Sequence, residues 1–158
     1  MAPDAALYFE IDRLFADYCA SLDEGDLNAW PEFFVDDGSY IMVARENYDH
    51  GYEIPLVYLD SKGMMQDRVF SLSNANIFQE HRYRHAMSGV RITAIEDDVV
   101  SVSSSYIVVQ TLLEGDTSIY QAGSYYDKLV REGDALKFKE RFVVYDTSRV
   151  QTLLATPV

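Results

Sequence analysis

The chain has 158 residues, 48% of them hydrophobic and 25% charged, which is typical of one soluble globular domain and predicts a single domain spanning residues 1–158. Its net charge of −13 disfavours nucleic acid and anionic membrane surfaces as partners, because both are bound through basic patches. The single cysteine, Cys19, excludes an intrachain disulfide, and with no signal peptide or apolar span in the sequence we expect a cytoplasmic protein.

Two amphipathic helices are predicted by apolar residues at three- and four-residue spacing. The first covers residues 7–22, with Asp4 as its N-cap and Gly25 just after its end. The second covers residues 62–72, where Ser61 supplies the N-cap.

A shorter helix is predicted between these two. With Asn28 as its cap, Pro31 falls in the first turn, where a missing N–H costs little, and we expect about two turns closed by residues 36–38. A buried strand over residues 39–44 follows, and residues 45–61 are expected to be mostly irregular.

From Arg82 onward the hydrophobic period changes to two, which predicts strands rather than helices. Short acidic turns separate four long segments, so we expect antiparallel hairpins. The predicted strands are residues 82–96, 99–113, 117–131 and 135–146. Helices followed by a long antiparallel meander predict an α+β domain in which a strongly curved sheet forms a cone-like half barrel around the helices.

Two positions in these strands carry specific expectations. Gly123 lies inside a strand, which predicts a bulge or a sharp bend. In the last strand, simple alternation places Leu136, Phe138, Phe142 and Val144 on one face and Lys137, Lys139 and Arg141 on the other.

His81 and His85 invite a metal-site interpretation, since Glu80 stands beside them. On a strand, however, residues four apart are separated by about 13 Å, whereas metal–nitrogen bonds are about 2 Å long. The two rings could share an ion only if the strand began after His81. We therefore expect histidines that are satisfied by hydrogen bonds.

The same alternation places Arg82 and Arg84 on one face of the strand and His85 on the other. This cationic face is either a solvated strand surface or a docking surface for an acidic partner. Leu153 and Leu154 belong to an apolar tail that follows the sheet. The tail is either a final packing element or part of a subunit interface, and we favour the interface. The candidate interface residues are therefore Arg82, Arg84, His85, Leu153 and Leu154.

A pocket enzyme with this cone shape would need a buried acid or base beside a polar partner. The candidates are Asp37, Tyr40, His85, Tyr106 and Tyr126. Single His and Tyr residues on an inward strand face are more often structural than catalytic, so no catalytic residue is assigned. The sequence also contains no glycine-rich phosphate loop, G-x-S-x-G motif or CxxC pair.

An ordered set of segments resembles the small (beta) subunit of aromatic ring-hydroxylating oxygenases over nearly the whole chain. These segments are AWPEFFVDDGSYIMVARENYD, YLDSKGMMQDRV, ANIFQEHRYRH, GSYYDKL and KERFVVYDTSRVQTLLATPV. The resemblance implies an NTF2/SnoaL-type cone fold and a non-catalytic role in aromatic compound catabolism, most similar to terephthalate and salicylate hydroxylases and thus to enzymes of aromatic carboxylates.

The family also implies partners and cofactors. A large (alpha) subunit would carry the Rieske [2Fe–2S] cluster and the mononuclear iron, in a hexamer of three large and three small chains supplied with electrons from NAD(P)H by a reductase and, in some systems, a ferredoxin. A Rieske centre needs two Cys and two His, and Cys19 is the sole cysteine. We therefore expect no cofactor or metal on this chain. The alternatives are a stand-alone isomerase, dehydratase or cyclase of the same fold, or a binding scaffold.

Overall fold

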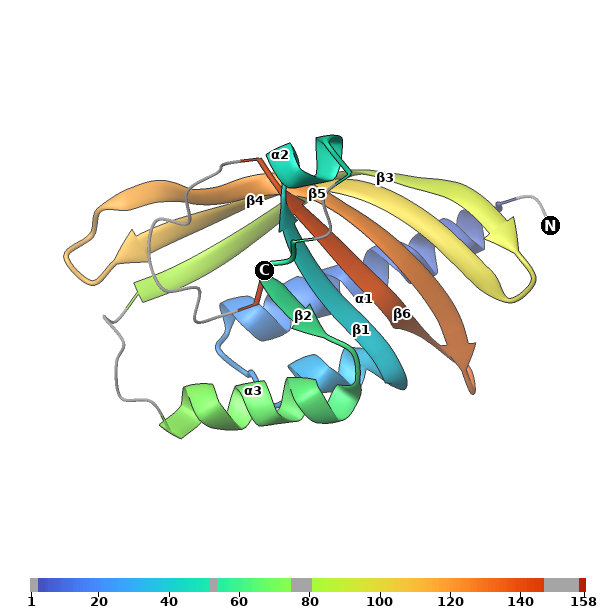
Figure 1. Ribbon diagram of the computed structural model, residues 1–158, viewed down its shortest axis with the longest axis horizontal. Helices are drawn as coiled ribbons and strands as arrows, with labels where there is room; N and C mark the ends of the chain where they lie inside the picture. The colour runs from blue at the N-terminus through green and yellow to red at the C-terminus, as the bar shows by residue number, and fades with distance from the viewer. Residues whose placement is uncertain (1–2, 52–53, 75–80, 147–156) are drawn as a thin grey trace.

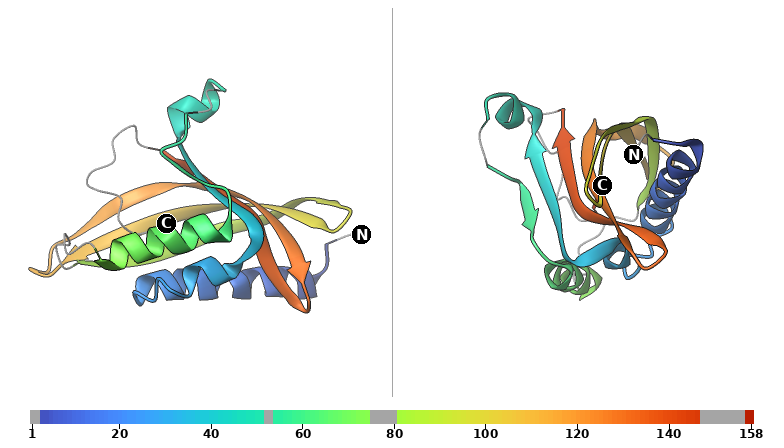
Figure 2. Two further views of the ribbon diagram at one scale, coloured as in Figure 1. Left: turned by 60° about the horizontal axis from the view of Figure 1, so that its bottom comes forward. Right: turned by 90° about the vertical axis from the view of Figure 1, so that its right-hand side faces the viewer.

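The structure is a computed structural model that describes residues 3–51, 54–74, 81–146 and 157–158. Two long helices lie on the concave side of a six-stranded sheet (Figure 1), and a short helix lies on the opposite side (Figure 2). In chain order the elements are α1 (Ala5–Asp23), the 3-10 helix η1 (Trp30–Phe33), β1 (Phe34–Ala44), α2 (Arg45–Asp49), β2 (Val57–Leu59), α3 (Lys62–Asn74), β3 (His81–Glu96), β4 (Val99–Leu112), β5 (Thr117–Glu132) and β6 (Ala135–Tyr145).

The two longer helices agree with their predicted positions and caps. The Asp4 side chain accepts a hydrogen bond from the Leu7 N–H (2.8 Å) at the start of α1. At α3 the Ser61 hydroxyl accepts one from the Met64 N–H (3.2 Å). Each cap satisfies a main-chain donor that the helix leaves unpaired.

The predicted two-turn helix after Asn28 is wrong in length. It is a single 3-10 turn, and Phe34 is already extended and paired with Phe138 in the sheet. Residues 36–38 therefore lie inside β1 instead of closing a helix. They lie in an irregular stretch between two pairs with β6, Phe34 with Phe138 and Ser39 with Glu140, which agrees with their turn-forming composition. The segment expected to be irregular contains α2 and the short strand β2.

The sheet has the strand order β2-β1-β6-β5-β4-β3. Strands β3 to β6 form the predicted antiparallel meander. β1 departs from this pattern because it runs parallel to β6, across a long chain connection that permits either direction. The long strands curl over α1 when the molecule is viewed end-on (Figure 2), so the predicted curved, cone-like α+β arrangement is confirmed.

A β-bulge at Lys139 reverses the side-chain alternation of β6. On β5, the consecutive residues Lys128 and Leu129 pair with Glu140 and Phe138, which leaves Lys139 as the extra residue. Two residues of a bulged strand oppose one on its partner, so alternation cannot be read through the bulge. The prediction that Arg141 lies on the solvent face with Lys139 is therefore wrong, and its side chain is fully buried.

Gly123 marks a close approach between β5 and β6, and the bulge between β4 and β5 lies nearby at Tyr120. A Cβ atom on Gly123 would overlap the Val144 carbonyl oxygen and would stand 2.9 Å from the Tyr145 Cα. Glycine is required here because there is no room for a side chain.

We predict that Gly123→Ala destabilises the protein by about 1–3 kcal/mol or more, because the strands must separate to admit the methyl group. Urea unfolding followed by circular dichroism measures the change. Gly63→Ala is the matched control, since its Cβ would meet nothing closer than the Ser61 hydroxyl at 3.7 Å and it lies in a helix, where alanine is favoured. Equal midpoints for the two variants would contradict the close approach.

Candidate functional site

The interior of the cone contains a fully buried ion pair between neighbouring strands. Arg141 of β6 lies 3.2 Å from Asp127 of β5 at both the Nε–Oδ1 and the Nη2–Oδ2 contacts, and neither side chain is exposed. A buried charge is costly unless it is paired. Alternation along β6 does not predict a buried Arg141, and the sequence offers no signal for the shift, because Phe142, Val143, Val144 and Tyr145 are all apolar.

Aromatic rings surround the buried guanidinium. Its Cζ atom lies 3.6 Å from the ring centre of Tyr125 and 4.4 Å from that of Tyr18. The rings of Phe138 and Phe15 follow at 4.6 and 5.1 Å. Rings at these distances stabilise a cation through their negative faces. α1 and strands β5 and β6 therefore meet around one charged group.

Burial also shifts the protonation of this pair. Loss of water raises the pKa of Asp127 to about 7, against the attraction of Arg141, which lowers it. Burial lowers the pKa of Arg141, but the charge of Asp127 and the neighbouring tyrosines raise it above its ordinary value. The guanidinium therefore remains charged, and burial opposes ionisation of the aspartate while the charge of Arg141 favours it.

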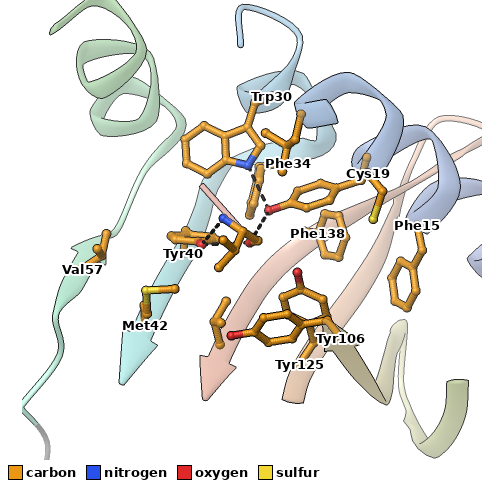
Figure 3. Close-up of a cluster of buried hydrophobic side chains, with 14 of the residues drawn as sticks. Phe15, Cys19, Trp30, Phe34, Tyr40, Met42, Val57, Tyr106, Tyr125 and Phe138 are labelled. Atoms are coloured by element: carbon orange, nitrogen blue, oxygen red, sulfur yellow. Dashed lines mark hydrogen bonds between the residues drawn. The ribbon is translucent and has the colours of Figure 1, made fainter. Parts of the chain in front are cut away.

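A second polar network fills the centre of the cone (Figure 3). The hydroxyls of Tyr18 and Tyr40 donate hydrogen bonds to the Val158 carbonyl oxygen (3.1 and 2.9 Å). The Trp30 indole N–H donates to the Tyr18 hydroxyl (3.1 Å), and the Val158 N–H donates to Tyr40 (3.1 Å). Val158 is 2% exposed, so it occupies the space between these rings.

His85 is bound to the end of α1. Its main-chain N–H donates to the Asp23 carboxylate (2.9 Å to Oδ2), and its ring Nδ1 lies 2.6 Å from Oδ1. The His85 side chain is fully buried. An open hollow of about 1210 Å³ lies beside this pair, between the end of α1 and the start of β3. This contact fixes α1 to the sheet edge.

The predicted acid and base candidates do not converge on one site. Asp37 is exposed and pairs with Lys139 (2.5 Å). Tyr126 stacks on Tyr48 of α2, with ring centres 5.5 Å apart, on the side of the sheet away from α1. Tyr106, which donates to Gln121 (2.6 Å), faces the interior, as do Tyr40 and His85. No acid and base pair from the predicted set shares a cavity within the described residues.

The donor set of the chain does not fit a Rieske cluster or a non-haem iron. One cysteine is too few for the cluster, and burial raises the pKa of the Cys19 thiol to about 11. β3 begins at His81, so His81 and His85 are separated along an extended strand. In the part of the chain that the structure describes, no three His, Cys, Asp or Glu side chains gather as a metal would require.

The predicted cationic face is present on β3. Arg82 and Arg84 are exposed, whereas Tyr83 and His85 between and beside them turn toward α1. The alternation inferred from the sequence is therefore confirmed for this strand. Leu153 and Leu154 lie outside the described residues.

Comparison with known proteins connects these features to a family. Residues 19–152 match the family described as "Ring hydroxylating beta subunit". This chain belongs to that family.

Relatives of this ring-hydroxylating beta subunit match it from end to end. It is 46% identical over 158 residues to the anthranilate 1,2-dioxygenase small subunit of Burkholderia cepacia, covering 100% of this chain and 98% of the relative. It is 32% identical to a terephthalate 1,2-dioxygenase terminal oxygenase beta subunit of a Comamonas species, covering 94% and 97% of the two chains.

A solved structure shows the same fold. It is a protein assigned as the beta subunit of an aromatic-ring-hydroxylating dioxygenase from Novosphingobium aromaticivorans, 43% identical, with a TM-score of 0.88 over 98% of this chain and 100% of that one. The predicted NTF2/SnoaL-type cone and the predicted family are confirmed. Within the described residues, no helix has the length and hydrophobicity that a membrane span requires.

We predict that Arg141→Leu destabilises the beta subunit by about 3–5 kcal/mol, because it leaves the Asp127 carboxyl buried without its partner. Urea unfolding measures the loss. The control is Arg131→Leu, which removes an exposed pair with Glu10 and should cost about 1 kcal/mol or less. Combining Arg141→Leu with Asp127→Leu should recover much of the stability, and an Arg141 variant as stable as the control would contradict this account.

Proposed function

We propose that this beta subunit is the structural, non-catalytic component of an oxygenase that hydroxylates an aromatic carboxylate. The observation that carries the proposal is the end-to-end similarity to the small subunit of anthranilate 1,2-dioxygenase. The terephthalate dioxygenase relatives support the same substrate class, since anthranilate and terephthalate are both aromatic carboxylates. We expect a cytoplasmic enzyme.

The partner in this proposal is a large subunit that carries the Rieske cluster and the catalytic iron. This chain has too few cysteines for the cluster, and its described histidines do not converge with carboxylates. We propose a hexamer of three large and three small chains, with a separate reductase, and in some systems a ferredoxin, delivering electrons from NAD(P)H.

A stand-alone enzyme of the same fold is the weaker candidate. Enzymes of this shape would use the interior of the cone, but here Tyr18, Tyr40 and Val158 fill that space. The arginine in the interior is neutralised by Asp127 and enclosed by rings. These groups stabilise the fold. The open hollow at the end of α1 is bordered by His85 and Asp23, but there the His85 ring Nδ1 is held by the Asp23 carboxylate.

The predicted interface residues remain proposals. Leu153 and Leu154 are proposed to contact the large subunit or a neighbouring small subunit. His85 is proposed to act indirectly, because its side chain is buried against Asp23 and can only position the surface of β3. Arg82 and Arg84 are exposed on that surface.

We predict that this chain co-purifies with a large subunit of Rieske type encoded beside it, and that the pair hydroxylates an aromatic carboxylate such as anthranilate when a reductase and NADH are added. The chain alone should give no turnover. Size-exclusion chromatography with light scattering measures the assembly, and oxygen uptake measures the reaction. Failure to co-purify, or turnover by the isolated chain, would overturn the proposed function.

We also predict that His85→Ala leaves the iron content of the intact hexamer unchanged, because His85 is bound to Asp23 and supplies no metal ligand. Metal analysis of purified hexamers measures iron per assembly. His81→Ala on the same strand is the matched control. Iron lost only from intact His85→Ala hexamers would show that this chain contributes a ligand.

A further inference from the structure

Three arginines stand apart from the other basic side chains of this protein. In the described residues, the side chains of Arg82, Arg84 and Arg91 form no hydrogen bond, ion pair or ring contact. Every other described lysine and arginine has an ion pair or another interaction. In a chain with a net charge of −13, acidic partners are abundant, so three exposed cations without one are unusual.

All three arginines project from the same face of β3. Ser88 pairs with Ser105 of β4, and Arg91 pairs with Ser103, so two residues of β3 oppose one residue of β4 between them. This bulge, at Gly89 with a φ of 66°, moves Arg91 onto the face that carries Arg82 and Arg84. The arginines therefore line the outer face of the sheet along its edge strand.

Apolar side chains lie beside these arginines on the same face. Arg84 pairs with Val109, which pairs with Ile119, so the three residues form one row across β3, β4 and β5. In the next row Ile107 stands beside Ala86. Ile119 is 63% exposed and Ile107 is 43% exposed, which is high for large apolar residues on a sheet.

Another part of this outer face is covered. Figure 2 (left) shows α2 on the side of the sheet opposite α1 and α3. Tyr48 of α2 stacks on Tyr126, and Arg45 donates to the Ser124 hydroxyl (3.1 Å). The covering helix contacts β5 and β6 but leaves the rows of β3 and β4 uncovered in the described residues.

We propose that Arg82, Arg84, Arg91, Ile107 and Ile119 form the docking surface for a carboxylate-bearing patch on the large oxygenase subunit. This inference rests on the proposed function, which supplies the partner. Isoleucines flanked by unpaired cations match the apolar centre and polar rim of protein interfaces. The cations identify the partner's surface as acidic, because complementary charge guides association and fixes the register of docking.

A simpler explanation is that the arginines only protect the edge of the sheet from pairing with other strands, which charged side chains commonly do. Glutamate would protect the edge equally well. Charge reversal therefore separates the two explanations, since it keeps a charged edge and repels an acidic partner.

The test uses the triple variant Arg82→Glu, Arg84→Glu and Arg91→Glu with the purified large subunit. We expect the isolated variant to keep the circular dichroism spectrum and melting temperature of the parent chain. Its affinity for the large subunit, measured by analytical ultracentrifugation, should fall at least about tenfold, since like charges across an interface are strongly unfavourable. Binding of the parent chain should weaken as salt increases.

The matched control is Arg13→Glu, Arg131→Glu and Lys139→Glu, which changes the net charge equally at exposed, ion-paired positions elsewhere. For the apolar part, Ile119→Asp should weaken binding, and Phe9→Asp on the exposed side of α1 should not. If both triple variants bind the large subunit equally well, the surface is assigned wrongly and the proposed function still stands.

Two further outcomes would overturn different proposals. If the parent chain itself fails to bind the large subunit, the proposed function fails, and this inference fails with it. If the charge reversal abolishes self-association of the isolated small subunit and leaves binding to the large subunit unchanged, the surface is occupied by a second copy of this chain, and the large-subunit proposal is wrong.

Discussion

The fold depends on one constraint: the positive charge of a buried guanidinium must be stabilised in an interior that solvent does not reach. Arg141 satisfies it by pairing with Asp127 on the adjacent strand and by lying against the rings of Tyr125 and Tyr18. Removing one partner of such a pair is far more damaging than replacing both. The bulge at Lys139 turns Arg141 into the interior, and the rings of Phe15 and Tyr18 on α1 pack against its guanidinium.

A filled interior agrees with a supporting role for the small subunit. Enzymes that work inside a cone need an open cavity with a few polar groups aimed into it. Here Asp127 is paired with Arg141, and Tyr40 is paired with the Val158 main chain. The Tyr125 hydroxyl and Arg141 Nη1 have no hydrogen-bond partner among the described residues, and the guanidinium is stabilised there by the aromatic rings. The polar groups of the interior therefore serve the packing of the small subunit.

Much of the fold could be predicted from the sequence, because helix caps and hydrophobic periodicity are local patterns. The caps at Asp4 and Ser61 and the outward placement of Arg82 and Arg84 follow from periodicity and capping chemistry. The buried ion pair could not be predicted, because a single extra residue at Lys139 reverses the alternation of inward and outward side chains beyond it. Bulges are set by the partner strands, which a single-sequence pattern does not describe.

The contact between α1, near the start of the sequence, and β6, near its end, has a consequence for biosynthesis. Phe15 and Tyr18 of α1 pack against Arg141 and Phe138, which belong to the final strand. The ribosome therefore produces the apolar face of α1 long before its packing partner exists. In partly made chains this apolar face stays exposed until β6 has emerged. In this protein the helix that is made first is among the last elements to be buried.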